Sequence, residues 1–426
     1  MKQYSVIFIG GGNRAIKMAT TMHSMPEQYH VLAVAEPMPE RKQVFREFGV
    51  AEENIVDDWH ELLTRPKMAD VAVIATQDNM HYEPAMKAIE LGYDILLEKP
   101  VAQTAQECAD IARAAREKGV KVLVCHVLRY TPFYGKIKEL LMAGTIGEVV
   151  SVDMVEAIGH THFAHSYVRG PWKSEKESTP MLVAKSCHDM DMVQWLVDRP
   201  CTRVQSFGSL THFTRANKPS GAPKRCLEGC PVGDTCPYNS VKFYYEDPKC
   251  SWRRLTTMGI AKEYWPTDDE VMQALQTRDF GLCVYQANND VCDHQVVNLE
   301  FEGGVTATFS VNAFNRGGRY VRIYGTKGEL FAYAADTEIQ LFTFEDNRRW
   351  TVEVPKIDET IFGGHGGGDD GIIRELHGYL SGSYTGFRAA DIDTSVRNHF
   401  IAFAAEQARH EGTVVDVSKL TRDYDM

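Results

Sequence analysis

The sequence predicts an α/β protein in two parts: an N-terminal doubly wound parallel sheet, and a C-terminal part built on a large open mixed or antiparallel sheet. Apolar runs alternate with helical patterns up to residue 126, and longer extended stretches dominate after about residue 127. Unbroken apolar strands that alternate with helices indicate a parallel sheet covered on both faces. We therefore expect one domain over 1–127 and a second over 128–426, with a cysteine-containing insertion at about 214–270.

Five apolar runs are the expected strands of the first domain: YSVIFIG, HVLAVAE, ADVAVIAT, YDILLEKP and VKVLVCHV. Helices are expected between them, notably over 81–92 and 104–119, and both segments end in glycine. Thr104 and Glu107 have the spacing of a capping box at the start of the second helix.

The second domain begins with a predicted helix at 133–143. Extended stretches follow, namely GEVVSVDMVEAIG, TRVQSFGSL, HQVVNLEFEGGVTATFSVNAF, GRYVRIYGTKGELFAYA and TEIQLFTF. EGG and TKG within them are typical of hairpin turns. A last helix is predicted at about 391–410, before Gly412.

Composition excludes several classes of function. The chain has 426 residues, 44% of them hydrophobic, which is ample for a large core. A net charge of −12 argues against nucleic-acid binding, because phosphate recognition needs a cationic face. Neither a signal peptide nor an apolar run near the roughly 20 residues of a membrane span is visible. We therefore expect a cytoplasmic protein with reduced thiols and no membrane partner.

A glycine motif follows the first strand. Gly10, Gly12 and Ala15 have the G-x-G-x-x-G/A spacing, between a strand and a helix. Such glycines let backbone N–H groups approach a pyrophosphate at a helix N-terminus. Glu36 ends the next strand, where a carboxylate binds both ribose hydroxyls and repels a 2′-phosphate. The pattern predicts an NAD site and favours NAD over NADP.

A lysine follows the predicted strand YDILLEKP. Lys99 would lie at the carboxyl end of the parallel sheet, where such folds bind ligands. It could bond a substrate hydroxyl or carry its proton, with Glu98 orienting it, and a surface ion pair is the alternative.

These segments resemble the Gfo/Idh/MocA (glucose–fructose oxidoreductase/inositol dehydrogenase/MocA) family. The resemblance covers nearly the whole chain and rests on GGGNRA, ATQDNMH, EKPVAQTAQEC and HDMDMVQWL. It implies a Rossmann domain followed by a sheet through which members associate, hence a homodimer or homotetramer. Thr76 and His81 match the cofactor-side loop, although Gln77 and Asp78 replace the usual proline and asparagine. The expected cofactor-binding residues are Gly10, Gly12, Asn13, Arg14, Ala15, Glu36, Thr76, His81, Glu98 and Lys99.

The stretch AKSCHDMDMVQWL, residues 184–196, predicts a helix capped by Ser186 and Asp189. His188 would then lie in the first turn, where the helix dipole favours a neutral ring. It matches the histidine of the family's D-x-x-x-H pattern, but Ala184 stands at the position of the aspartate. Lys185 could instead bind a carboxylated or ketonic substrate or take the proton role. The alternative is that Lys185 reaches solvent and His188 only supports the helix.

Other polar and aromatic residues gather in predicted loops. CHVLRYTPFY and HTHFAHSYVRGPWKS suit a sugar, with its apolar ring and hydroxyl rim. FGGHGGGDDG resembles a stretch of the NAD-dependent glycosidases in the same superfamily. The expected substrate-binding residues are His126, Arg129, Tyr130, Tyr167, Arg169, Trp172, His365 and Asp369. A metal held by His160, His162 and His165 is a weaker hypothesis, because no carboxylate spacing supports it.

The insertion contains the run C-x3-C-x5-C at Cys226, Cys230 and Cys236. Thiols this dense in a reducing compartment predict a structural zinc ion, with an iron–sulfur cluster as the alternative. Cys283 is the preferred fourth ligand, and Cys250, Cys292 and His294 are the others considered.

Taken together, the residues and the resemblance predict an NAD(H)-dependent oxidoreductase of a sugar, polyol or glycoside, with Lys99, His188 and Lys185 as catalytic residues. One alternative is a redox-neutral glycoside-cleaving enzyme that keeps its NAD and works by C3 oxidation, elimination, hydration and re-reduction. A second alternative is a non-catalytic NAD-dependent sensor.

Overall fold

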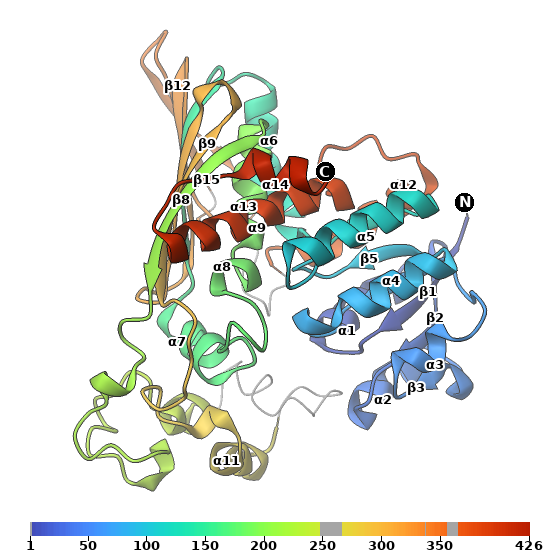
Figure 1. Ribbon diagram of the computed structural model, residues 1–426, viewed down its shortest axis with the longest axis vertical. Helices are drawn as coiled ribbons and strands as arrows, with labels where there is room; N and C mark the ends of the chain where they lie inside the picture. The colour runs from blue at the N-terminus through green and yellow to red at the C-terminus, as the bar shows by residue number, and fades with distance from the viewer. Residues whose placement is uncertain (1, 248–265, 337, 356–364) are drawn as a thin grey trace.

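The computed structural model describes residues 2–247, 266–336, 338–355 and 365–426, which form two units side by side (Figure 1). A helix-covered sheet contains the first strands of the chain, and a long upright sheet contains most of the later ones. The helix α13 (Ile392–Glu411) runs between the two units. The predicted two-part α/β architecture is confirmed.

The N-terminal sheet has six parallel strands in the order β3-β2-β1-β4-β5-β6. Their bounds are Tyr4–Ile9 for β1, Tyr29–Ala35 for β2, Ile55–Val56 for β3, Val71–Ile74 for β4, Asp94–Leu97 for β5 and Val122–Val124 for β6. The strand order reverses between β1 and β4, and ligands of open α/β sheets bind outside the carboxyl ends of the strands at such a reversal. The two-residue strand β3 was not among the predicted strands.

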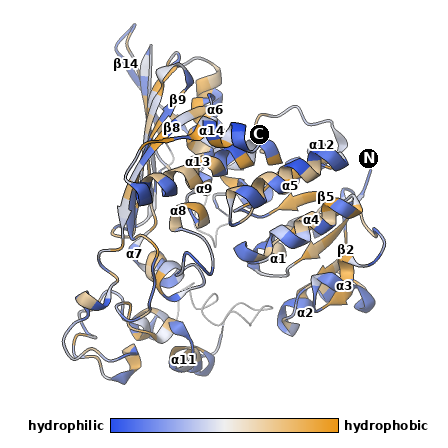
Figure 2. Ribbon diagram, viewed as in Figure 1, coloured by the Kyte–Doolittle hydropathy of each residue, from blue (hydrophilic) through white to orange (hydrophobic). Residues whose placement is uncertain are grey.

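Helices cover both faces of this sheet, and its strands are hydrophobic along their length (Figure 2). Val6 and Phe8 of β1 pack with α1 (Asn13–His23) and α2 (Pro39–Glu47). The other face packs with α3 (Trp59–Leu63), α4 (Tyr82–Leu91) and α5 (Ala105–Lys118). The predicted capping box of Thr104 and Glu107 is present at the start of α5.

One helix of the N-terminal unit comes from near the end of the chain. Helix α12 (Gly368–Ser381) packs beside α1, where the Thr21 hydroxyl donates to Asp370 Oδ1 at 2.6 Å. The Tyr29 hydroxyl donates to the carbonyl of Ile373 at 2.8 Å. The residues immediately before α12 are thereby carried to the glycine motif.

The C-terminal sheet has nine strands in the order β14-β13-β12-β11-β7-β10-β9-β8-β15, and all neighbours are antiparallel except β7 and β10. The bounds are Val149–Ala157 for β7, Cys201–Ser209 for β8, His294–Phe301 for β9, Thr306–Asn312 for β10, Gly318–Gly325 for β11, Gly328–Tyr333 for β12, Glu338–Thr343 for β13, Arg348–Glu353 for β14 and Val415–Asp416 for β15. Hairpins join β9 to β10 and β11 to β12 at the predicted EGG and TKG turns.

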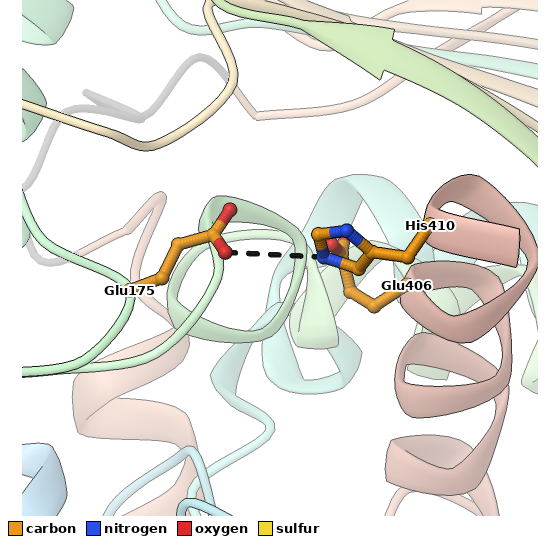
Figure 3. A group of neighbouring side chains, drawn as sticks. All are labelled: Glu175, Glu406 and His410. Atoms are coloured by element: carbon orange, nitrogen blue, oxygen red, sulfur yellow. Dashed lines mark ion pairs between the residues drawn. The ribbon is translucent and has the colours of Figure 1, made fainter.

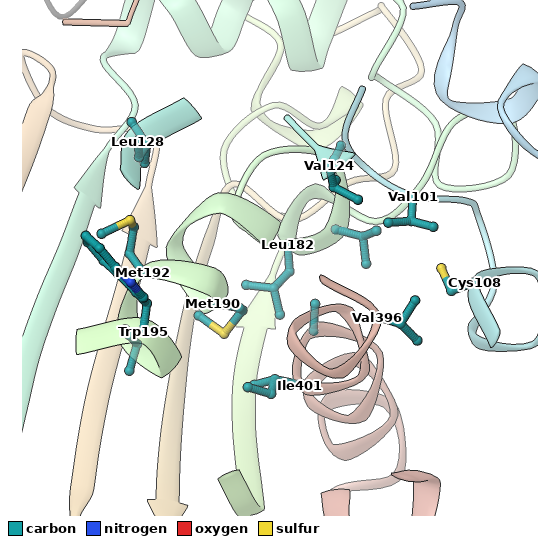
Figure 4. Packing of buried hydrophobic residues seen from close by; sticks show 14 of the residues in the cluster. Val101, Cys108, Val124, Leu128, Leu182, Met190, Met192, Trp195, Val396 and Ile401 are labelled. Carbon is teal, nitrogen blue, oxygen red and sulfur yellow. The ribbon is translucent and has the colours of Figure 1, made fainter. Parts of the chain in front are cut away.

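One face of this sheet packs against α9 (Cys187–Val197) and α13, and no described helix covers the other face (Figure 1). The first face joins the two units into one core. Met190 of α9 and Ile401 of α13 lie in the same hydrophobic cluster as Val101 and Val124 of the N-terminal unit (Figure 4). This shared packing holds the C-terminal unit against the N-terminal unit.

The insertion belongs to neither sheet. Its described residues form the short helices η5 (Arg215–Asn217), η6 (Cys226–Glu228) and η7 (Val241–Glu246), then α11 (Asp268–Thr277). A small separate core of Tyr244, Val271, Leu275 and Phe280 lies beneath them. Among the described helices, none has the length and apolarity needed to cross a membrane.

Candidate active site

The glycine turn between β1 and α1 fits a dinucleotide. Gly10 has φ +91°, and a Cβ there would lie 2.7 Å from the carbonyl oxygen of Ala75, so the turn packs directly on the strand end. A Cβ on Gly12 would meet only the Arg41 guanidinium, at 3.7 Å, which leaves room for a phosphate. No side chain caps α1, and its first turn contains no acidic residue. The free N–H groups of the helix are therefore suited to a pyrophosphate.

Glu36 lies just beyond the end of β2, with only 3% of its surface exposed. Its carboxylate accepts hydrogen bonds from the backbone N–H groups of Gly11 at 2.8 Å and Met38 at 3.0 Å. These bonds hold the carboxylate beside the glycine turn, where the ribose of a dinucleotide binds in this fold.

Lys99 lies beyond the carboxyl end of β5 and reaches toward the C-terminal unit. Its Nζ donates to the carbonyl of Ala184 at 3.0 Å, immediately before the chain enters α9. His81 forms hydrogen bonds with the carbonyls of Pro100 at 2.7 Å and Thr76 at 3.3 Å. These two bonds connect the loop after β4 to the loop after β5.

Arg14 links the glycine motif to two other segments. Its Nε donates to Glu98 Oε1 at 2.7 Å, and its Nη1 lies 2.6 Å from Asp369 Oδ2 and 3.3 Å from His365 Nδ1. Burial alone would raise the pKa of Asp369, but Arg14 and His365 overcome it and hold that pKa well below its ordinary value. The predicted cofactor and substrate residues of three distant segments thus meet at one guanidinium.

His188 lies in the first turn of α9 with 5% of its surface exposed, and its Nδ1 has no hydrogen-bond partner in the described structure. Burial lowers its pKa well below the ordinary value, and the neighbouring Lys99 adds to the shift. The ring is therefore neutral at pH 7. Its centroid lies 6.4 Å from that of His365 and 5.9 Å from that of His126.

A second charged cluster lies beside His188. Lys185 Nζ is 3.4 Å from Glu156 Oε1, and Arg319 Nε is 2.6 Å from Glu156 Oε2 and 3.0 Å from Asp189 Oδ1. The predicted cap is wrong, because the Ser186 side chain makes no capping bond and Asp189 turns to Arg319 instead. Burial lowers the pKa of Lys185, and burial raises the pKa of Asp189 to about 6 although Arg319 opposes it.

Glu156 and Arg319 were missed from the sequence, although a signal was present. Glu156 follows Val152 and Met154 at two-residue spacing, which puts a carboxylate on the face that the alternation assigns to the core. Arg319 precedes Val321 in the same way and is the register partner of Glu156. A buried ion pair across two adjacent strands is costly, and such pairs often mark functional sites.

The loop after β7 adds aromatic groups. Tyr167 is 4% exposed, and burial raises its pKa well above the ordinary value, with Asp78 and Glu156 among its charged neighbours. Trp172 packs near Tyr167, and its Nε1 donates to Asp78 Oδ2 at 3.0 Å. Burial lowers the pKa of His162, and the nearby positive charge of Lys185 lowers it further. The His162 ring is therefore also near the cluster of Lys185, Glu156, Arg319 and Asp189.

Other predicted substrate residues are engaged elsewhere. Arg129 makes a two-pronged ion pair with Asp191, at 2.8 Å and 2.7 Å. Tyr130 packs in the core under α12, and Arg169 donates to the carbonyls of Leu282 and Tyr238. His126, by contrast, is fully buried beside His188, and neither of its ring nitrogens has a hydrogen-bond partner in the described structure. Burial lowers its pKa to about 4.

The four cysteines predicted as metal ligands line one cavity: Cys226, Cys230, Cys236 and Cys283. No three of their sulfur atoms lie within 4.8 Å of one another. Of the other ligands considered, Cys250 lies outside the described residues. Cys292 is buried outside this cavity, and His294 pairs with Asp293 at 2.8 Å.

Within the described residues, a different trio places three potential ligand atoms within 4.8 Å: Glu175, Glu406 and His410 (Figure 3). An arginine already neutralises it, because Arg409 Nη2 lies 3.1 Å from Glu175 Oε1 and 2.7 Å from Glu406 Oε2. We interpret this trio as an ion-pair cluster that ties α13 to the loop at residue 175. The histidines of the 160–165 loop form no such trio.

Comparison with known proteins agrees with this geometry. The family model of the Gfo/Idh/MocA oxidoreductases, described as an NAD-binding Rossmann fold, matches residues 4–126. The model of the family's C-terminal alpha/beta domain matches residues 138–417. The chain belongs to the Gfo/Idh/MocA oxidoreductase family.

Relatives within this family differ in their reactions. The Bacillus subtilis (strain 168) oxidoreductase YteT is 27% identical over 395 residues, covering 87% of this chain and 88% of that protein. The 2,7-anhydro-N-acetylneuraminate hydratase of Escherichia coli (strain K12) is 28% identical over 156 residues, 36% of this chain and 40% of that protein. Levoglucosan dehydrogenase, solved with NADH and levoglucosan, has the same fold, with a TM-score of 0.69 at 19% identity over 98% of this chain and 100% of that chain.

Proposed function

We propose that the protein is an NAD(H)-dependent oxidoreductase that acts on a hydroxyl group of a sugar, polyol or glycoside. One observation carries the proposal. Beyond the carboxyl end of β5, Lys99 Nζ bonds the carbonyl of Ala184, four residues before His188, and this amine helps to lower the pKa of the His188 ring, whose buried Nδ1 has no partner in the described structure. A glycine turn suited to a dinucleotide follows β1 of the same sheet. A substrate hydroxyl between Lys99 and His188 would be bonded by both groups.

The chemistry follows from the charges of these groups. Bound NAD would supply the hydride acceptor or donor. His188 is neutral at pH 7, so it takes the hydroxyl proton as a general base, while Lys99 donates a hydrogen bond to the oxygen. Glu36 would bind the ribose hydroxyls and disfavour a 2′-phosphate, hence the preference for NAD over NADP.

Substrate positioning would come from the opposite wall. Tyr167 and Trp172 offer aromatic faces to a sugar ring, and Lys185 and His365 offer polar contacts at its rim. Lys185 would also suit a substrate that carries a carboxylate.

A second candidate is a redox-neutral reaction, in which oxidation of the sugar, elimination, hydration and re-reduction cleave a glycosidic bond. The favouring observation is an excess of acid–base groups. Lys185, Glu156, Asp189 and His162 surround the site in addition to Lys99 and His188, more than transfer of one hydroxyl proton requires. The hydratase among the relatives is a further reason to test it.

Substrate screening separates the candidates. A panel of free sugars, polyols and aryl glycosides is incubated with enzyme and NAD, with NADH followed by absorbance and aglycone release by chromatography. NADH build-up supports the dehydrogenase, and cleavage without net NADH supports the redox-neutral reaction. His188→Gln and Lys99→Met should each lower kcat about 10²–10⁴-fold, the usual contribution of a positioned proton-transfer group. The matched control is Lys87→Met, whose amine is at the surface beside Glu90. NAD binding without turnover of any substrate would favour the sensor.

We also infer that the uncovered face of the C-terminal sheet is where two copies of the chain associate. Phe331 of β12 is 38% exposed and Phe207 of β8 is 57% exposed on strands of this sheet. A tyrosine pair, Tyr320 and Tyr333, stacks with ring centroids 4.4 Å apart in the same sheet. Large exposed apolar groups on one face are typical of an interface.

A further inference from the structure

The cavity between the cysteines lies where two parts of the insertion meet. Its volume is about 20 Å³, enough for one water-sized particle. Cys226, Cys230 and Cys236 come from one segment, and Cys283 comes from the segment after α11. The two segments are paired, because Arg225 and Leu282 form a β-bridge and the Cys283 N–H donates to the carbonyl of Lys224 at 2.9 Å.

The thiols already receive hydrogen bonds from N–H donors. The backbone N–H of Tyr238 donates to Cys236 and that of Tyr285 donates to Cys283, each two residues beyond the cysteine. Arg169 Nη2 donates to Cys226 Sγ at 3.9 Å. Burial raises the pKa of the Cys236 and Cys283 thiols, and these N–H donors oppose that shift. The same donors would stabilise the sulfur atoms as thiolates once a metal binds.

Arg169 is a buried cation that lacks a carboxylate among its described hydrogen bonds. It is 3% exposed, and its donors go to the carbonyls of Leu282 and Tyr238 and to the sulfur of Cys226. A buried charge without a counter-charge is costly. A negatively charged group in the cavity would offset this cost, and four thiols that could bind a cation line it.

We propose that Cys226, Cys230, Cys236 and Cys283 bind one zinc ion, which joins the two segments of the insertion and gives Arg169 its counter-charge. Four thiols would release four protons to solvent, and the zinc–tetrathiolate centre would carry a charge of −2. Zinc suits the site because thiolates in tetrahedral geometry bind this ion and closed four-ligand sites are structural. No three of the sulfur atoms are at ligand spacing, so zinc binding would require the cysteine side chains to rotate to other staggered rotamers.

The proposed site would also stabilise the substrate wall. Arg169 ends the π-helix η4 (Ala164–Arg169), two residues after Tyr167. Through Arg169, the metal centre would hold the loop that presents Tyr167, and it does so whatever reaction the enzyme catalyses. The proposal therefore stands apart from the proposed function.

Metal analysis of the full-length protein tests the proposal. Protein purified under reducing conditions, loaded with zinc and dialysed should hold about one zinc per chain by mass spectrometry of the metal. Cys236→Ala and Cys283→Ala should retain less than about a tenth of that zinc. The matched control is Cys292→Ala, which removes a buried thiol of the same region outside the cavity and should retain the ion.

A second measurement uses the wild-type chain and does not depend on variants that fold. Removal of the metal with a chelator should expose four additional thiols to a colorimetric thiol reagent, and cobalt(II) should then restore a thiolate-to-metal absorption band. Absence of zinc from the loaded protein, unchanged zinc in Cys283→Ala, iron with acid-labile sulfide, or a disulfide between these cysteines would each overturn the proposal.

Discussion

Replacement of Arg129 by methionine is a direct test of how the segment after β6 is held to α9 and α13. Asp191 in α9 is fully buried, and Arg129 donates to both of its oxygens. Asn398 of α13 adds a third bond at 2.5 Å. Burial alone would raise the pKa of Asp191, but Arg129 and its other partners overcome it and keep that pKa below its ordinary value. The carboxylate is therefore charged at pH 7 and relies on Arg129.

Arg129→Met leaves that charge uncompensated, which costs about 3–5 kcal/mol of unfolding free energy for a buried pair. Arg129→Met/Asp191→Leu should lose less than Arg129→Met alone, because the orphaned carboxylate is gone. The matched control is Arg116→Met, whose pair with Asp393 is at the surface and should contribute at most about 1 kcal/mol. The assay is urea unfolding followed by tryptophan fluorescence and circular dichroism.

The pH dependence of the defect has a definite sign. Because the pKa of Asp191 is lowered in the folded protein, the stability that its ion pair contributes is present above the ordinary carboxylate pKa and is lost as pH falls through the lowered value. The deficit of Arg129→Met should therefore shrink in acid. A loss below about 1 kcal/mol at pH 7 together with a raised substrate KM would refute this reasoning and return Arg129 to the substrate site.

Three more outcomes are expected. The unfolding free energy should fall as pH drops below about 6.5, by about 1.4 kcal/mol per pH unit for each buried histidine. The reason is that the histidines of the unfolded chain bind protons in this range and those of the folded chain do not. A urea midpoint that stays constant down to about pH 5.5 would contradict this. The histidines with lowered pKa are His126, His162, His165, His188, His365 and His399. Glu36→Gln should weaken NAD binding about tenfold or more and should reduce the ratio of NADP Kd to NAD Kd, both measured by cofactor titration. If that ratio is unchanged, Glu36 does not recognise the ribose. Phe331→Glu should shift the protein to a smaller species in light scattering, whereas Val414→Glu, exposed outside the sheet, should not.

Local patterns in the sequence predicted the fold correctly. The capping box at Thr104 and the hairpins at EGG and TKG need only neighbouring residues, and all three are present. The predicted cap at Ser186 failed because a distant arginine, Arg319, attracts Asp189 more strongly than the free N–H groups of the helix do. A buried opposite charge outweighs a local bond, and no sequence window contains both partners.

For the predicted substrate-binding residues, too, the local sequence indicated the residue types but not their contacts. Residue types typical of a sugar site were recognisable in the loops, but their contacts were not. Arg129 and Arg169 looked alike as candidate ligands, and each instead serves a buried partner outside the described site. Arg14 was expected only at the cofactor, yet it pairs with Glu98 and also with Asp369, which lies more than 300 positions after Arg14 in the chain.

By itself the sequence determined the order of most strands, though not of β3, β14 and β15. It also determined the glycine turn with Glu36 and the presence of Lys99 at a strand end, because periodicity, turn chemistry and motif spacing are properties of neighbouring residues. Only the tertiary structure decided that Glu156 and Arg319 meet beside Lys185, that α12 carries His365 to the nucleotide side, and that Cys283 joins the other three cysteines. Those meetings depend on strand register and on packing between segments far apart in the chain, and a pairwise contact of that kind leaves no local pattern from which to predict it.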